Sequence, residues 1–406
     1  MTPDLLLASA KSSSPVEYNS HIQTKEVERL LKEGKKRSEI ARILKAKPTA
    51  VDYHLHKIRH GWSIPAYQPS TIDYNKYIDW RVYNEGLVKR GEILMDFDIF
   101  SHWHKEIEEI NRGKVGAPFE YPDSFINFLL RFKTGFHIGY RQVKGLARKL
   151  IVFIPQAKSA PDYTTLQRRF EAMEVELAVY QSGAVQDIAQ DSSGIKTSNR
   201  GEYKTLKYER EQKKEYVKMH IAVNIQTKEV VGLEVTLSTV SDSQVSGELI
   251  RQAQQRGRIR KDFADSAYDS NSNYQKHLEE GIEPIIKPSR KGTLKSARQR
   301  LARLEKKQDR GRLKPGELGQ MARLKVLIEY FQDYRLWKEK TGYGLRWYSE
   351  GHFSAFKRIM GEYVFSRKYG NIIKELKFKS NMMNLFKFVS KGYRKEEVPK
   401  DQKIPA

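Results

Sequence analysis

Three acidic residues of this 406-residue chain stand where folding could gather them around a metal ion. Asp191 follows the apolar pair Ile188–Ala189, Asp265 follows Phe263–Ala264, and Glu350 lies in a segment with helical spacing. Carboxylate oxygens are the ligands that Mg²⁺ or Mn²⁺ prefers, and such ions share their coordination with substrate phosphates. The pattern therefore predicts metal-assisted phosphoryl transfer on nucleic acid.

Glu350 belongs to a longer pattern, Tyr343-x2-Arg346-x3-Glu350-x6-Lys357. At about 100° per residue, these four residues fall within roughly a 60° arc of one helix. We expect Glu350 to complete the metal site, Arg346 and Lys357 to hold DNA phosphates, and Tyr343 to contact a base or phosphate. The alternative is a solvated helix in which Arg346 and Glu350 simply form an ion pair.

Other carboxylates compete for the same role. Asp187 shares a strand face with Asp191, but Asp191 is expected at the end of its strand, before Ser192-Ser193-Gly194, where a ligand site can open. Asp262 and Asp269 flank Asp265. None of the 10 histidines has metal-ligand spacing with a partner, which argues against a zinc site.

The periodicity changes from helical to strand-like after residue 183. Strands are expected from 185 to Asp191 and over 216–225, 229–237, 259–265 and 284–287, with helices at 243–256 and 271–280. The order is βββαβαβ with a closing helix, so Asp191 lies on the first strand and Asp265 on the fourth. The fold class is α/β.

The N-terminal part is predicted to be all-helical. Three short amphipathic helices over residues 20–62 favour a helix-turn-helix DNA-binding domain, in which Thr49, Tyr53, His54 and Lys57 face the groove. A three-helix protein-interaction bundle is the alternative. Residues 63–83 are expected to form a linker, and residues 84–180 a helical domain that is either a second DNA-binding module or simply a packed core.

Residues 290–340 form a basic helical insertion. Between residues 290 and 314 there are 11 Lys or Arg residues and two acidic residues. A helical hairpin along DNA, contacted through Arg298, Arg303 and Lys307, is one interpretation; a dimer contact or a solvated face is the other. A basic tail follows at 391–406.

The composition agrees with a polyanionic partner. The chain has 74 Lys plus Arg against 50 Asp plus Glu and a formal net charge of +24. No apolar run reaches 18 residues, and the N-terminus lacks the basic segment of a signal peptide. The absence of cysteine excludes disulfides and thiolate metal sites. We expect a cytoplasmic protein associated with DNA, without a membrane partner.

Taken together, the two aspartate motifs and the Tyr343–Arg346–Glu350–Lys357 spacing resemble those of insertion-sequence DDE transposases. The similarity covers roughly residues 115–390, where residues 115–170 are similar to a helical domain found in one branch of that family. It implies an RNase H-like catalytic domain at 181–390, built on a mixed five-stranded sheet flanked by helices. The family pattern Asp-x-Ala-Tyr-Asp selects Asp265 as a ligand and leaves Asp269 as a helix N-cap.

The resemblance also implies an activity: metal-dependent cleavage at the ends of a mobile element, then strand transfer of the 3′-OH into target DNA. It implies two Mg²⁺ or Mn²⁺ ions, terminal inverted repeats and target DNA as partners, and a homodimer or higher assembly on DNA. The rival interpretations are a domesticated, non-catalytic DNA-binding regulator and an RNase H-like nuclease that cuts without joining. Joining of DNA ends distinguishes the transposase from both.

Overall fold

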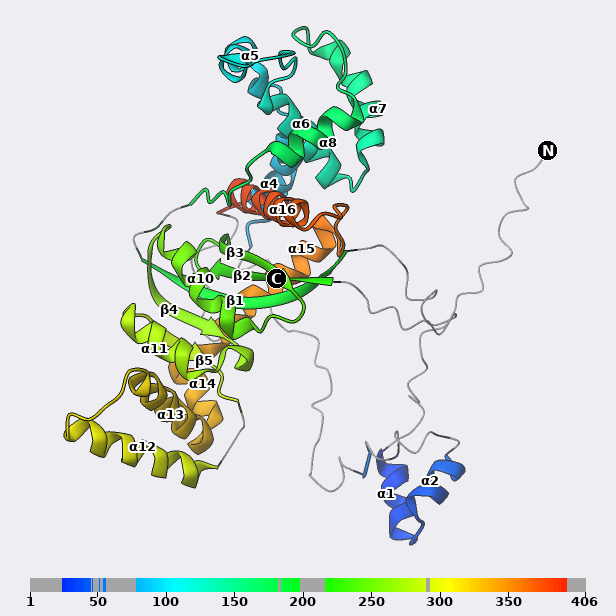
Figure 1. Cartoon of the computed structure of the whole chain (residues 1–406). Coiled ribbons are helices and arrows are strands. Elements are labelled where there is room, and N and C mark those ends of the chain that lie inside the picture. Colours follow the sequence, from blue (N-terminus) through cyan, green and yellow to red (C-terminus); the bar gives the residue numbers. More distant parts are fainter. Residues whose placement is uncertain are drawn as a thin grey trace. The chain divides into compact units, whose positions relative to one another are not determined.

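The computed structural model describes residues 24–44, 46, 51, 54–55, 78–181, 183, 185–197, 216–289 and 293–392 (Figure 1). The chain divides into two compact units, residues 1–73 and 74–406. No helix among the described residues is long and apolar enough to cross a membrane.

The described residues of the first unit include two of the three expected helices, α1 (Thr24–Lys32) and α2 (Arg37–Ile43), whereas most of the third lies outside the described residues. Their apolar faces bury Val27, Leu30 and Ile40, together with Val51 from the segment that follows. His54 is helical, whereas Thr49, Tyr53 and Lys57 lie outside the described residues. The DNA-binding role of this unit stays a prediction.

The second unit begins with a helical part. Its elements are α4 (Trp80–Glu92), η2 (Ile93–Met95), η3 (Asp98–Phe100), α5 (Trp103–Asn111), α6 (Asp123–Gly135), α7 (Tyr140–Leu150), η4 (Ile151–Phe153) and α8 (Tyr163–Ala172). The central helix, α6, buries Phe125, Phe128 and Phe132 in an aromatic core. Because the Asp79 carboxylate accepts the backbone N–H groups of Arg81 and Val82, α4 starts at Trp80, inside the segment expected to be a linker.

A five-stranded mixed sheet confirms the predicted fold class. Its strands are β1 (Val185–Lys196), β2 (Tyr216–Asn224), β3 (Val230–Leu237), β4 (Arg258–Ala264) and β5 (Glu283–Ile286), in the order β3-β2-β1-β4-β5. The first three strands are antiparallel neighbours, and β4 joins β1 in parallel, with β5 parallel to β4. The β2–β3 turn is tight because Asn224 Oδ1 accepts the N–H groups of Gln226 and Thr227.

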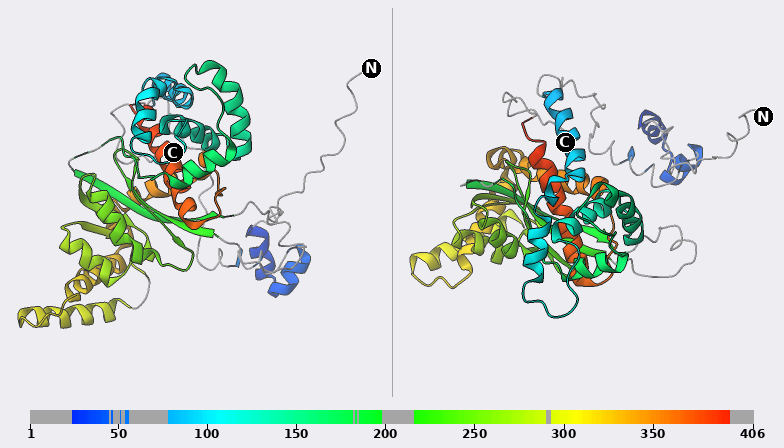
Figure 2. Two further views of the ribbon diagram at one scale, coloured as in Figure 1. Left: turned by 45° about the horizontal axis from the view of Figure 1, so that its top comes forward. Right: turned by 90° about the horizontal axis from the view of Figure 1, so that it is seen from above.

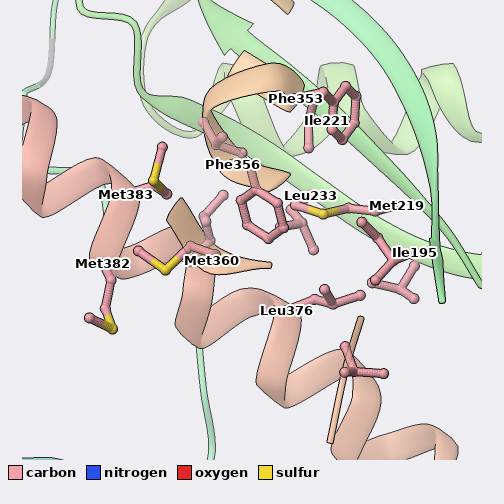
Figure 3. Packing of buried hydrophobic residues seen from close by; sticks show 14 of the residues in the cluster. Ile195, Met219, Ile221, Leu233, Phe353, Phe356, Met360, Leu376, Met382 and Met383 are labelled. Atoms are coloured by element: carbon pink, nitrogen blue, oxygen red, sulfur yellow. The ribbon is translucent and has the colours of Figure 1, made fainter. Parts of the chain in front are cut away.

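Helices cover both faces of the sheet. On one face lie α10 (Asp242–Gln254) and α11 (Asn271–Glu279), with η5 (Ser266–Tyr268) between β4 and α11. On the other lie α15 (Trp347–Met360) and α16 (Tyr369–Val389), and Figure 3 shows Phe353 beside Ile221 and Phe356 near Met219 there. The sheet is therefore the middle layer of an α/β/α arrangement.

The basic insertion is a helical hairpin, as predicted. It consists of α12 (Leu294–Asp309) and α13 (Glu317–Gln332), and is followed by α14 (Tyr334–Thr341) and η6 (Tyr343–Arg346). Leu304 of α12 packs on Met321 and Leu324 of α13. On its other side α13 packs against α11, so the yellow hairpin stays beside that helix in both views of Figure 2.

The last helix, α16, joins the helical part to the sheet. It packs on β3, and at its end the Ser390 hydroxyl donates to the carbonyl of Gly86 in α4 at 3.0 Å. Arg90 of α4 donates to the same hydroxyl at 2.8 Å. Hydrogen bonds thus join residues that are about 300 positions apart in the sequence, and they hold α4 against the end of α16.

The contact between α11 and α13 gives a test of this architecture. A Cβ at Gly319 would lie 2.5 Å from backbone atoms of Asn271 and Gln275, so Gly319→Ala should lower the free energy of unfolding by about 1–3 kcal/mol. Gly145→Ala is the matched control, because it adds a methyl group to an exposed position of α7 with open space, and it should stabilise by roughly 0.5–1 kcal/mol. Urea unfolding of both variants measures this, and equal effects would contradict the close packing.

Candidate active site

The register between β1 and β4 brings Asp191 and Asp265 together. The last parallel pair joins Ala189 to Phe263. Asp191 lies two residues further along β1, and Asp265 is the residue just after β4, where the backbone is still extended. Because side chains alternate between faces, both aspartates lie on the Ala189–Phe263 face at the same level of the sheet. Neighbouring strands are about 4.8 Å apart, so the two carboxylates are close neighbours.

The expected strand end at Asp191 is wrong. β1 continues to Lys196, because β2 pairs with it throughout, with Asp191 opposite Ile221 and Lys196 opposite Tyr216. The site opens instead on the β4 side, where pairing with β1 stops at Ala189. Ser192-Ser193-Gly194 is strand, and Gly194 lies against the ring of Tyr216, so a side chain there would be crowded.

The Tyr343–Lys357 motif covers this same face, but not as a single helix. Gly342, at φ 69°, ends α14, and Tyr343–Arg346 forms the 3₁₀ turn η6 before α15 begins. Side chains three apart in a 3₁₀ turn lie on the same side, so Tyr343 and Arg346 still point together. η6 packs on β1 and β4, and α15 packs on β1, which carries Glu350 to the aspartates.

The charges in this cluster act on Asp191. Burial raises the pKa of Asp191 to about 6, and the carboxylates of Asp265 and Glu350 add to that rise. The N–H of Ser192, which donates to Asp191 Oδ1 at 2.8 Å, and the Arg346 guanidinium act in the opposite direction. Asp191 therefore lies within electrostatic reach of both other carboxylates, and a bound cation would relieve their mutual repulsion.

Arg346 is the cation of the cluster. It forms an ion pair with Glu350, and its Nε–H is buried without a hydrogen-bond partner. A buried unpaired donor is costly and has the chemistry to bind a phosphate oxygen. The Arg346–Glu350 ion pair, which belonged to the alternative interpretation of this helix, is thus present beside the carboxylate cluster.

Tyr343 differs from the expectation of a DNA contact. Its side chain is buried, with its ring centroid 5.1 Å from that of Trp337 and its edge beside Ala189 and Phe263. The Arg346 guanidinium lies 5.7 Å from the ring centroid. Tyr343 therefore packs η6 onto the sheet and supports Arg346, and its ring is covered by protein.

The competing carboxylates are each engaged elsewhere. Asp187 pairs with Arg260, at 2.9 Å from Nε, and Asp262 is buried with His277 at 2.7 Å and Gln190 at 2.5 Å. Asp269 holds Arg323 in a two-point contact and accepts from Ser289. The expected N-cap role of Asp269 is wrong, because Ser270 caps α11. These contacts leave Asp191, Asp265 and Glu350 as the carboxylates of the open face.

The donor chemistry fits a hard divalent cation. All three groups offer carboxylate oxygens, and the pKa of Asp191 is raised mainly by burial, with smaller contributions from the carboxylates of Asp265 and Glu350. Within the described part of the chain, no three His, Cys, Asp or Glu side chains are already drawn together tightly enough to hold a metal ion. The Arg346 guanidinium, through its ion pair with Glu350, already neutralises part of the negative charge that such an ion would bind.

The predicted DNA contacts outside the cluster are distributed over three surfaces. Lys357 is half-buried on α15, two helical turns beyond Glu350. Arg298 and Arg303 are exposed on α12, whereas Lys307 forms an ion pair with Glu317 of α13 at 2.6 Å. Lys307 thus helps to close the hairpin. The sequence predicted a possible second DNA-binding module at 84–180 without assigning contact residues; in α7 of that segment Arg141, Arg148 and Lys149 are exposed, and the helix has no acidic residue.

Comparisons with known proteins identify a family for this chain. Two family models, each described as a transposase DDE domain, match residues 88–200 and 186–372. Similar solved structures include a Drosophila P element transposase strand transfer complex, with 11% identity over 73% of this chain and 87% of that one, at a TM-score of 0.26. The Mos1 strand transfer complex matches with 8% identity over 94% and 97%, at 0.24. A simian T-cell lymphotropic virus intasome in complex with PP2A regulatory subunit B56 gamma matches with 13% identity over 48% and 64%, at 0.21.

The raised pKa of Asp191 leads to a stability test. An acid whose pKa rises from 3.8 in the unfolded chain to about 6 in the folded one loses stability as pH rises between those values. Asp191→Asn removes that cost, so in EDTA at pH 7.5 the variant should be more stable by about 2 kcal/mol. Near pH 4.5 the difference should shrink.

Urea unfolding at both pH values measures this effect. Asp309→Asn, an exposed aspartate of α12, serves as the control and should change little at either pH. A variant less stable than the parent at pH 7.5 would contradict the crowding of carboxylates at Asp191.

Proposed function

The chain belongs to the DDE transposase family, and we propose that Asp191, Asp265 and Glu350 form its catalytic metal-binding centre. The observation that carries this assignment is the parallel β1–β4 register, with Asp191 and Asp265 on one face and level of the sheet. The electrostatic effect of Glu350 on Asp191 supports the third member. The engagement of Asp187, Asp262 and Asp269 in other contacts supports the choice among the acidic residues.

The proposed centre takes two Mg²⁺ or Mn²⁺ ions. When bound, such ions activate the attacking hydroxyl group and stabilise the departing 3′ oxygen of a phosphodiester. Asp191 must be deprotonated to act as a ligand, so at pH below about 6 metal binding has to displace a proton from it. Its desolvated position makes the carboxylate a strong partner for a cation once ionised.

Arg346 has a role that depends on charge. Its ion pair with Glu350 can be exchanged for a contact with a phosphate oxygen when a cation binds the carboxylate. Lys357, on α15 with Glu350, adds a second cation further along the DNA. Together these residues would orient a phosphodiester beside the carboxylates.

The proposed reaction is cleavage at the ends of a mobile element followed by joining of the freed 3′-OH to target DNA. The net charge of +24 supports DNA as the partner. We propose that the N-terminal unit, through Thr49, Tyr53, His54 and Lys57, recognises the terminal inverted repeats, and that a homodimer or larger assembly holds the two ends.

Replacement of the three carboxylates tests the centre. Asp191→Asn, Asp265→Asn and Glu350→Gln should each lower Mg²⁺-dependent cleavage of element-end DNA by a factor of at least about 10³, because a metal ligand is lost. Binding of the same DNA in EDTA should change little. Gel analysis of both cleaved and joined products is the measurement.

Asp187→Asn is the matched control, since Asp187 lies on the same strand but pairs with Arg260. It should keep cleavage within a few-fold of the parent, as an amide can still accept from that guanidinium. Substantial cleavage by Asp191→Asn would remove that residue from the centre, and cleavage without joining by the parent protein would indicate a nuclease.

The α12 face gives a second test. If Arg298 and Arg303 lie on DNA phosphates, changing both to Gln should flatten the slope of log affinity against log salt by up to about 1.8, or about 0.9 per contact. Lys307 is left intact because it closes the hairpin with Glu317. If sedimentation instead shows a larger monomer fraction with an unchanged slope, the hairpin is a dimer contact.

A further inference from the structure

We propose that the outward side of α7, together with the adjoining turn η4, binds duplex DNA, with the helix along the phosphates and the apolar turn against bases. The proposal rests on the proposed function in one respect, that the protein acts on DNA. It names a surface far in sequence from the carboxylates and from the basic hairpin.

The first observation is the one-sided charge of α7. Val143 and Ala147 are buried in the core of the helical part, whereas Arg141, Arg148 and Lys149 are exposed on the opposite side. At 100° per residue these three cations fall within about 100° of one another on the helix. α7 contains no acidic residue, and no ion pair found in the described segments involves any of the three.

The surroundings of α7 show which charges are already satisfied. Lys144 forms an ion pair with Asp162, which also caps α8, so that cation is largely neutralised. Arg141 lies with its guanidinium 4.9 Å from the ring centroid of Tyr163, which holds it in place without cancelling its charge. Gly145, between the cations, has open space beside it, so a phosphate backbone can approach the helix closely.

The second observation is an apolar tip at the end of this stripe. Val152 is 77% exposed and Phe153 is 73% exposed, although both are large apolar residues. They lie in η4, whose flanking Ile151 and Ile154 pack into the core of the helical part. Because side chains three apart in a 3₁₀ turn share one side, this anchoring holds Val152 and Phe153 outward.

These two features together favour DNA over other occupants. An apolar tip bordered by Arg148 and Lys149 matches a surface that offers both phosphates and stacked bases. Proteins that insert apolar side chains between base pairs combine such a wedge with basic residues on the flanking phosphates. A second copy of the same surface would bring like charges together, which disfavours self-association through it.

Binding of a short duplex by the full-length protein in EDTA tests the proposal, since no metal is needed for the contact. Phe153→Ser and Val152→Ser should each lower affinity, the former by roughly fivefold or more, because the stacked contact is lost. Phe153→Tyr keeps an aromatic face and should bind like the parent. Val115→Ser is the matched control, as Val115 is 97% exposed elsewhere in the same unit.

The basic stripe is tested separately. Changing Arg141, Arg148 and Lys149 to Gln should flatten the salt slope by up to about 2.7, or about 0.9 per phosphate contact. The control changes Arg81, Lys89 and Lys105, three exposed cations of α4 and α5, and removes the same net charge. It should leave the slope nearly unchanged.

The outcomes separate this surface from the proposed function. Duplex bending, followed by energy transfer between end labels, should fall with Phe153→Ser and not with Val115→Ser. Unchanged affinity and bending in the tip variants, or equal slopes in the two triple variants, would overturn the proposal while cleavage by the parent stood. If cleavage is lost in the carboxylate variants while the α7 and η4 variants bind as expected, the proposal for this surface still stands.

Discussion

The parallel pairing of β1 with β4 is the contact on which the candidate active site depends. Two strands that are far apart in the sequence must run side by side in one register before Asp191 and Asp265 share a face and a level. A shift of one residue would send one carboxylate to the opposite face, under α10. The other parts of the site pack on these two strands: η6 on both β1 and β4, and α15 on β1, together with the cations that they carry.

A buried polar network fixes that register from the other face. His277 of α11 donates toward Asp262 of β4, and Gln190 of β1 donates to the same carboxylate. Burial lowers the pKa of His277, but the hydrogen bond to Asp262 more than offsets this effect, so that pKa is raised overall. Gln190, next to Asp191, and Asp262, three residues before Asp265, are thus tied across the strands, so the open face has a rigid support.

Much of the fold was accessible from the sequence, because its periodicity is local. Alternating residues such as Val217, Met219 and Ile221 identify β2, and the apolar run before Asp265 identifies β4. Contacts between side chains that are far apart in the sequence could not be predicted in the same way. Asp269 looked like a cap until Arg323, 54 residues away, was found to bind it.

The errors at the site have similar causes. Ser192-Ser193-Gly194 has the composition of a turn, yet β2 imposes strand on it through consecutive pairs up to Lys196. Gly342 has a positive φ and ends α14, so the four motif residues divide between the 3₁₀ turn η6 and the helix α15. Helical spacing alone could not reveal that Tyr343 packs on Trp337. Which residues of this segment become buried depends on how the segment lies against the sheet, and the sequence pattern does not show this.

The contact of α4 with the end of α16 also has a consequence for the time at which the enzyme forms. Ser390 and Gly86 meet across about 300 residues, so α4 cannot complete its packing until the segment that contains Ser390 has left the ribosome. The sheet, whose last strand ends at Ile286, has all its strands synthesised earlier. Helices α7 and α12 also precede Glu350 in the sequence, so these basic helices are synthesised before the third carboxylate of the proposed centre.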